Sequence, residues 1–164
     1  MSRWDRGLDY ITVYNLILKH MRRSRGKRKC YDSILLIQLR NGSRISEAVR
    51  AYIEYVKTRN SEVKVLVSKK RREVKRLMVI PSEVEICEEL LLVDERRLVD
   101  RLKHYSLNTF NINTHSLRYA FITYLLKIGT NPAIISKITK HSRLDLILTY
   151  TQEKVAEDVL REAV

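Results

Sequence analysis

Long apolar runs are absent from this sequence. No stretch of the 164 residues approaches the roughly 18 to 20 continuous apolar residues that a membrane-spanning helix needs. The first ten residues, MSRWDRGLDY, also lack the apolar centre of a secretory signal peptide. We therefore expect an intracellular, cytoplasmic protein with no membrane partner.

Cysteine is scarce as well. The two cysteines, Cys30 and Cys87, have neither the paired spacing of a zinc site nor a histidine at ligand spacing. We expect them to be free thiols, buried or half-buried, and the pattern implies no metal site.

Acidic residues are few in the first half of the chain. Residues 1–80 carry 21 Lys and Arg against 7 Asp and Glu, a net charge of +14, whereas residues 81–164 carry 11 against 12. Two clusters concentrate the positive charge, RRSRGKRK at 22–29 and KKRREVKR at 69–76. A merely solubilising surface would scatter its lysines among glutamates, so the clusters favour a polyanionic partner, most commonly nucleic acid.

The first half of the chain predicts helices followed by a β-hairpin. Helical periodicity covers residues 8–21, and the basic run 22–29 interrupts it as a loop or arm. A short buried helix, SILLIQLRNG, closes at Gly42, and Ser43 is the candidate cap of the next helix. EVKVLVS and VKRLMVIP alternate as two strands around a cationic tip at residues 68–73.

The second half predicts further helices. Pro81 and a Ser82/Glu85 capping box predict a helix directly after the hairpin, and another is expected over residues 94–105. Residues 114–128 form a helix ended by Gly129, Asn131-Pro132 starts the next, and residues 152–163 make an amphipathic tail. The fold class is therefore mainly α with a small antiparallel β-hairpin or three-stranded sheet (α+β), in a single domain.

Several polar residues stand where core residues would serve. His115 and Arg118 are three apart, so they share the first turn of a helix, where a phosphate would also meet free backbone N–H groups. Taken singly, His115 could be a capping or core histidine and Arg118 a structural ion pair. Arg44 could be a solvated residue at a helix start, with Glu47 paired to Arg50 or buried as a structural partner.

Together, two arginines, a lysine, two histidines and a tyrosine are what metal-free phosphoryl transfer requires. Arginine gives bidentate, permanently charged donors to phosphate oxygens. A tyrosine such as Tyr150 can attack phosphorus and store the bond energy as a phosphotyrosyl ester without a cofactor. A lysine can protonate the leaving 5′ oxygen, and a histidine such as His141 can manage the tyrosine proton.

Four segments, in order over residues 33–151, resemble the catalytic domain of the tyrosine recombinases, the phage-integrase family. NGSRISEA resembles the family's Gly-x-Arg-x-x-Glu motif, and THSLRYAFITYLL its His-x-x-Arg box. ITKHSRLDLILTYT resembles the segment with a histidine nine residues before the nucleophile. The hairpin VKVLVSKKRREVKRLMVIP stands where the family carries its catalytic lysine, with SKK in place of Gly-Lys-Gly.

The resemblance implies a catalytic set and a support residue. The set is Arg44, Lys69, His115, Arg118, His141 and Tyr150, with Glu47 as structural support and Lys70 as the alternative to Lys69. It also implies a single catalytic domain over 1–164, made of a helix and basic arm (1–30), a catalytic core (31–151) and a tail (152–164). The chain has no room for the family's N-terminal DNA-clamp domain, so we expect either a fragment of a longer integrase or a minimal recombinase. The residues expected to bind DNA are Arg22, Arg23, Arg25, Lys27, Arg28, Lys29, Lys70, Arg71 and Arg72.

The implied function is site-specific recombination, with integration of a mobile element as its use. Double-stranded DNA is the expected partner, four protomers are expected in the synaptic complex, and no cofactor or metal is needed. A prokaryotic cell or a virus-infected host is the expected setting. Two alternatives stay open at this point: DNA relaxation of the type IB topoisomerase kind, and a DNA-binding accessory module without chemistry.

Overall fold

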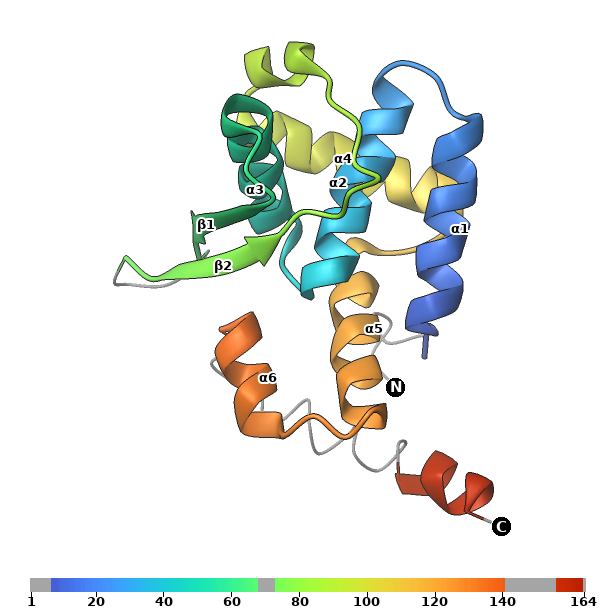
Figure 1. Ribbon diagram of the computed structural model, residues 1–164. Helices are drawn as coiled ribbons and strands as arrows, with labels where there is room; N and C mark the ends of the chain where they lie inside the picture. Colours follow the sequence, from blue (N-terminus) through green and yellow to red (C-terminus); the bar gives the residue numbers. More distant parts are fainter. Residues whose placement is uncertain (1–6, 68–72, 141–155, 164) are drawn as a thin grey trace.

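The computed structural model describes residues 7–67, 73–140 and 156–163 of the chain (Figure 1). Its helices are α1 (Tyr10–Arg23), α2 (Lys27–Asn41), α3 (Ile45–Thr58), the 3-10 helix η1 (Glu88–Leu92), α4 (Glu95–Phe110), α5 (Thr114–Lys127) and α6 (Pro132–Thr139). The strands are β1 (Glu62–Leu66) and β2 (Lys75–Val79), and residues 156–162 are also helical. The mainly helical fold with a β-hairpin is confirmed.

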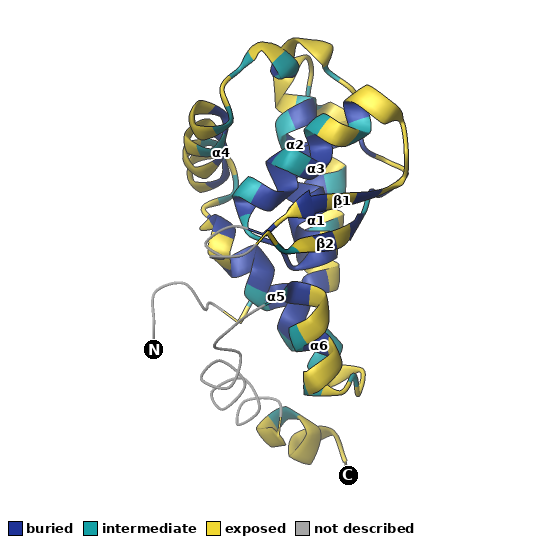
Figure 2. Ribbon diagram, turned by 90° about the vertical axis from the view of Figure 1, so that its left-hand side faces the viewer, coloured by how far each residue is buried: buried dark blue, intermediate teal, exposed yellow. Residues whose placement is uncertain are grey.

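Helix α2 is the centre of the fold. It lies between α1 and α3, with α4 behind it and α5 below it in Figure 1. Every residue from Asp32 to Leu39 is buried. In Figure 2 this part of α2 is mostly dark blue, whereas α4 and α6 each have one exposed, yellow side. A helix that is buried all round needs neighbours on every face, which explains its central position.

The hairpin covers one side of this helical core. β1 and β2 pair antiparallel, with Val63 opposite Met78 and Val65 opposite Arg76. The strands alternate exposed and buried residues, as the sequence predicts, so their inward face packs on the helices. The predicted tip, residues 68–73, falls mostly outside the described residues.

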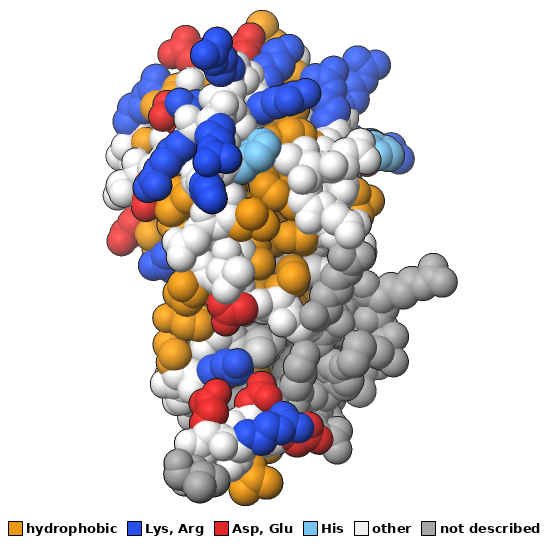
Figure 3. All heavy atoms as spheres, turned by 90° about the vertical axis from the view of Figure 1, so that its right-hand side faces the viewer, with side chains coloured by type: hydrophobic (Ala, Val, Ile, Leu, Met, Phe, Trp, Pro, Cys, Tyr) orange, Lys and Arg blue, Asp and Glu red, His pale blue; other side chains and the backbone are white. Residues whose placement is uncertain are grey.

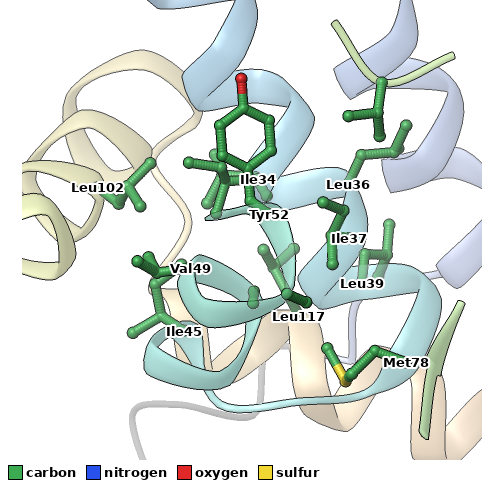
Figure 4. Packing of buried hydrophobic residues seen from close by; sticks show 14 of the residues in the cluster. Ile34, Leu36, Ile37, Leu39, Ile45, Val49, Tyr52, Met78, Leu102 and Leu117 are labelled. Carbon is green, nitrogen blue, oxygen red and sulfur yellow. The ribbon is translucent and has the colours of Figure 1, made fainter. Parts of the chain in front are cut away.

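A single apolar cluster joins these elements. Figure 4 shows Ile34 and Leu39 of α2 together with Val49 and Tyr52 of α3, Met78 of β2 and Leu117 of α5. The Tyr52 hydroxyl donates to the Glu85 carbonyl and accepts from the Cys87 N–H, each at 2.9 Å. Burial raises the pKa of Tyr52 to about 12. Residues 80–87 are therefore held by the core rather than by a helix of their own.

Three local predictions were wrong. The basic run 22–29 is mostly helical, because α1 continues to Arg23 and α2 begins at Lys27, and Lys and Arg are good helix formers. No helix follows Pro81 directly, and the first helical residues there form η1 from Glu88. Ser43 does not cap α3, since Arg44 occupies the N-cap position without a side-chain cap bond.

The expectation of free thiols was also wrong. Cys30 at the start of α2 and Cys87 before η1 form a disulfide, with their Cα atoms 6.2 Å apart. The bond closes a sequence separation of 57 residues, and Cys30 is almost completely buried. This covalent link ties the segment before η1 to the central helix.

The later helices agree with the sequence. α4 starts at Glu95 but runs on to Phe110, past the predicted residue 105. α5 ends one residue before Ile128, and α6 begins at Pro132 behind an Asn131 cap that accepts from the Ala133 N–H. Among the described residues, no helix is both long and apolar enough to span a bilayer.

Candidate active site

Gly42 sets the direction in which the chain leaves α2. It adopts a left-handed φ of 58°, and the N–H groups of Gly42 and Ser43 donate to the carbonyls of Leu39 and Gln38. A Cβ on Gly42 would collide with the Phe121 ring of α5. The tight turn therefore lies directly against α5 and delivers Arg44 to the start of α3, as predicted.

Two buried amides of α2 join the segments that carry the site. Gln38 Nε2 donates to the Ser43 carbonyl at 3.1 Å and to the Thr114 carbonyl at 2.9 Å. Asn41 Nδ2 donates to the Val79 carbonyl, while Asn41 Oδ1 accepts from the Val79 N–H, each at 2.8 Å. The start of α5 and the strand β2 are thus both fixed to the end of α2.

Glu47 lies between two arginines from different elements. Its Oε2 accepts from Arg44 Nη1 at 3.1 Å, and its Oε1 is 3.5 Å from Arg76 Nη1. The Glu47 side chain is completely buried and that of Arg44 is 20% exposed. Arg50 pairs instead with Glu95 at 2.5 Å, so of the two alternatives for Glu47 the buried structural partner is the one found.

Arg118 is buried in α5 at 2% exposure. Its Nη2 donates to the Thr139 carbonyl at the end of α6, at 3.4 Å, and its Nε and Nη1 have no hydrogen-bond partner among the described residues. Burial lowers the pKa of Arg118 to about 10, with Arg44 and Arg76 adding to the effect and Glu47 opposing it. The guanidinium still carries its charge at neutral pH.

His115 lies one turn before Arg118 but is exposed, whereas Arg118 is not. Its backbone N–H donates to Asn113 Oδ1, the cap of α5, at 2.9 Å. A small depression beside it is lined by Lys103 and Leu107 of α4. The predicted pairing of His115 and Arg118 on one helical turn is therefore present, with the histidine on the solvent side.

Sequence reasoning missed Arg76. It is 2% exposed and, besides Glu47, donates from Nη2 to the Asn41 carbonyl at 2.6 Å. Burial lowers the pKa of Arg76, and Glu47 opposes that shift. The signal was available, because strand alternation puts residue 76 in phase with Met78 on the inward face, where an arginine is out of place.

The three arginines and one glutamate, Arg44, Arg76, Arg118 and Glu47, make a cluster with a formal charge of +2. Buried charge of one sign in such excess is costly unless an anion balances it. Planar guanidiniums with free N–H groups suit phosphate oxygens. Beside the cluster, a groove of about 530 Å³ between β2 and α6 carries further cations, namely Arg40, Lys75, Lys137 and Lys140.

Other predicted site residues lie outside the described residues: Lys69, Lys70, Arg71, Arg72, His141 and Tyr150. Among the residues described, no group of three His, Cys, Asp or Glu side chains could hold a metal ion.

The basic cluster at residues 22–29 lies at the other end of α2 from Arg44 (Figure 1). A helix of 15 residues rises about 20 Å, so the two places are well separated. All of its Arg and Lys side chains are exposed except Lys29, which is half-buried and 4.0 Å from Glu85. Figure 3 shows Lys and Arg gathered on the upper half of the α1 side, with Asp and Glu beside them.

Solved structures share this fold. The Tn1549 transposon integrase, in complex with transposon right end DNA, matches 93% of this chain with a TM-score of 0.53 at 18% identity. The XerH site-specific recombinase bound to difH substrate matches 92% with a TM-score of 0.54 at 17% identity. The chain spans 65% and 50% of these two proteins.

The sequence comparisons carry the assignment further. No family model matches the chain. A protein of Acidianus two-tailed virus, "Putative integrase ORF241", is 39% identical over 97% of this chain and 68% of its own length. With that relative and with the fold of a recombinase, the chain belongs to the tyrosine recombinase family.

Proposed function

We propose that this protein cleaves and rejoins DNA strands at specific sites through a 3′-phosphotyrosyl intermediate, in the integration of a mobile genetic element. One observation carries the proposal: a buried guanidinium cluster with a formal surplus of two positive charges, in a chain 39% identical to the viral protein named "Putative integrase ORF241". A scissile phosphodiester supplies the missing negative charge.

In this mechanism Arg44 and Arg118 bind the non-bridging oxygens of the scissile phosphate. Arg118 has free donors, Nε and Nη1, among the described residues, and Arg44 is partly open to solvent. Negative charge builds on these oxygens in the transition state, so fixed cationic donors lower the barrier. His115, on the open side of the same helix, donates a hydrogen bond to the phosphate or helps with proton transfer.

The covalent steps use residues at the family's motif positions. The Tyr150 oxygen attacks phosphorus and loses its proton, with His141 assisting, and the bond from phosphorus to the 5′ oxygen breaks. Lys69 protonates that oxygen as general acid, with Lys70 as the alternative. A 5′ hydroxyl then attacks the phosphotyrosine, releases Tyr150 and restores a phosphodiester. Atoms and charge balance without any cofactor.

Double-stranded DNA is the partner in this proposal. Both solved neighbours are bound to DNA, and the basic groove between β2 and α6 continues the positive charge of the cluster. In this proposal Lys70, Arg71 and Arg72, which lie outside the described residues, contact the phosphates of the DNA backbone. We place four protomers in the synaptic complex, with residues 31–151 as the catalytic core, acting in the cytoplasm of a prokaryotic or virus-infected cell.

A nicked suicide substrate tests the proposal. The 5′ hydroxyl that would reverse the reaction diffuses away, so the wild-type protein should accumulate a covalent adduct, and should do so in EDTA because arginine and lysine supply the positive charge. Tyr150→Phe should lose the adduct and keep its affinity for DNA. A persistent adduct in this variant would move the nucleophile to another residue.

Incubation with supercoiled DNA, beside the suicide substrate, separates the alternatives. Relaxation of supercoiled DNA without strand exchange between two duplexes would indicate the topoisomerase activity. Binding without any adduct would indicate an accessory module. Arg44→Lys should recover only part of the cleavage lost in Arg44→Ala, because a point charge cannot replace the planar fork.

A further inference from the structure

Arg76 is a buried arginine that does not reach the surface. Its side chain is 1% exposed and spans three elements: it starts on β2, donates from Nη2 to the carbonyl of Asn41 at the end of α2, and approaches Glu47 of α3. Its Nε has no hydrogen-bond partner among the described residues. Its guanidinium is engaged with the Asn41 carbonyl and Glu47, and the residue adjoins the candidate active site.

Packing alone does not account for an arginine here. Position 76 pairs with Val65 across the hairpin, and its inward neighbour on the strand is Met78, so an apolar side chain would suit the site. Replacing buried charged groups by apolar residues of similar volume is often neutral or stabilising. The cost of burying Arg76 points to a role in the charge balance of the site.

That role follows from the position of Glu47. One carboxylate oxygen accepts from Arg44 at 3.1 Å, while the other is 3.5 Å from Arg76. With Arg76 present, each oxygen faces a different guanidinium and the trio keeps a charge of +1. Without it, both oxygens are free to pair with Arg44 in a bidentate fork, which would neutralise Arg44 and hold it away from a phosphate.

We infer that Arg76 is a positioning residue for strand cleavage: by sharing the Glu47 carboxylate, it fixes the orientation of Arg44 and preserves its positive charge for the scissile phosphate. This inference rests on the proposed function, since it concerns the same phosphate site. It adds a residue that acts through Arg44 to the set that determines the cleavage rate.

The test compares single-turnover cleavage and DNA affinity in wild type and four variants. Arg76→Gln keeps a donor for the Asn41 carbonyl but loses the charge. It should slow cleavage by about 10- to 100-fold, which is less than the loss caused by removing a residue that donates directly to the phosphate. The Kd for DNA should change by less than about threefold. Arg76→Lys keeps the charge and should cleave within about tenfold of wild type. Lys64→Gln, an exposed lysine on the same hairpin, is the matched charge control and should cleave like wild type.

The double variant Arg76→Gln/Glu47→Gln separates charge balance from general structural damage. A neutral amide still accepts from Arg44 but cannot neutralise it, so cleavage should recover about tenfold relative to Arg76→Gln. Losses that simply add in the double variant would contradict the inference. So would wild-type cleavage by Arg76→Gln, or a folded Arg76→Lys that is inactive.

Thermal melts followed by circular dichroism accompany each variant. If Arg76→Gln does not melt cooperatively, the test uses Arg76→Lys and the double variant, which removes the uncompensated carboxylate. Each should then cleave within about tenfold of wild type, and a folded but inactive Arg76→Lys would contradict the inference. Wild-type protein on the same substrate provides the reference. No adduct from wild type would refute the proposed function, whereas an active wild type with unchanged Arg76 variants would refute only the role of Arg76.

Discussion

Loss of the Cys30–Cys87 disulfide should reduce the stability of this protein by about 4 kcal/mol. Cross-linking removes conformational entropy from the unfolded chain by about 2.1 + 1.5R ln n cal/mol/K. For the separation of 57 residues, this gives about 14 cal/mol/K, or about 4 kcal/mol at 25 °C. In a domain of this size each kcal/mol moves Tm by roughly 2 to 4 °C, so the expected fall is about 8 to 16 °C.

Cys87→Ser is the cleanest perturbation. Cys87 is half-buried, so a hydroxyl there costs little, whereas Cys30 is 1% exposed and Cys30→Ser would add the penalty of burying a polar group. Urea unfolding followed by circular dichroism measures the loss, with and without a phosphine reductant. Reductant should lower the stability of the wild type to that of Cys87→Ser and leave the variant unchanged.

Two results would refute this reasoning. One is an equal free energy of unfolding for oxidised and reduced wild type. The other is two titratable thiols per chain in protein unfolded without reductant, since the disulfide leaves none. Cleavage at 25 °C should be the same in both redox states, because the bond lies at the start of α2 and the candidate active site at its end.

Three further perturbations address the site itself. Arg118→Ala should cut single-turnover cleavage by about 100- to 1,000-fold and DNA affinity far less, measured by adduct formation and by filter binding, and full activity would make it a structural arginine. Gly42→Ala and Gly26→Ala should each cost about 1–2 kcal/mol, because both glycines have a positive φ. Gly42→Ala should lower the melting temperature further, because only there would the added methyl group collide with the Phe121 ring. The double variant Arg71→Ala/Arg72→Ala should weaken binding to all DNA sequences alike. The slope of log K against log salt concentration should become shallower by about 0.9 for each phosphate that is no longer neutralised. An unchanged slope would place the hairpin tip away from DNA.

The fold was readable wherever a local signal determines the backbone. Gly42 ends α2 in a left-handed conformation, and Asn131-Pro132 begins α6, both as residue type alone predicts. The alternation of apolar and polar residues likewise predicts β1 and β2 from the local sequence alone. These signals act within a few residues, so the rest of the chain cannot easily override them.

Long-range contacts explain what the sequence did not reveal. Pro81 and the Ser82/Glu85 pattern favour a helix locally, yet the Glu85 N–H donates to Ser33 Oγ and the Glu85 carbonyl accepts from the Tyr52 hydroxyl. Core side chains therefore take the backbone groups that a helix would need. The disulfide is of the same kind, because 57 residues separate its cysteines and only the folded chain brings them together.

In the candidate site too, local motifs predict some residues, whereas long-range contacts determine the others. Arg44, Glu47, His115 and Arg118 follow from two short motifs, and their mutual placement follows from the buried amides Gln38 and Asn41 that no motif includes. Arg76 belongs to no motif either. The role inferred for it depends on sharing the Glu47 carboxylate with Arg44, which lies 32 positions earlier in the chain.

The burial of these arginines bears on how such a site can work. Arg118 and Arg76 are held in place by the carbonyls of Thr139 and Asn41, so their guanidiniums are oriented before any ligand arrives. The free energy that fixes them is spent in folding, when burial already opposes their charge, as the lowered pKa of Arg118 indicates. A phosphate that enters the cluster then meets Arg118, and the Arg44 that Arg76 and Glu47 hold in place, without further ordering of these donors. The gain is largest in the transition state, where the negative charge of the phosphate is greatest.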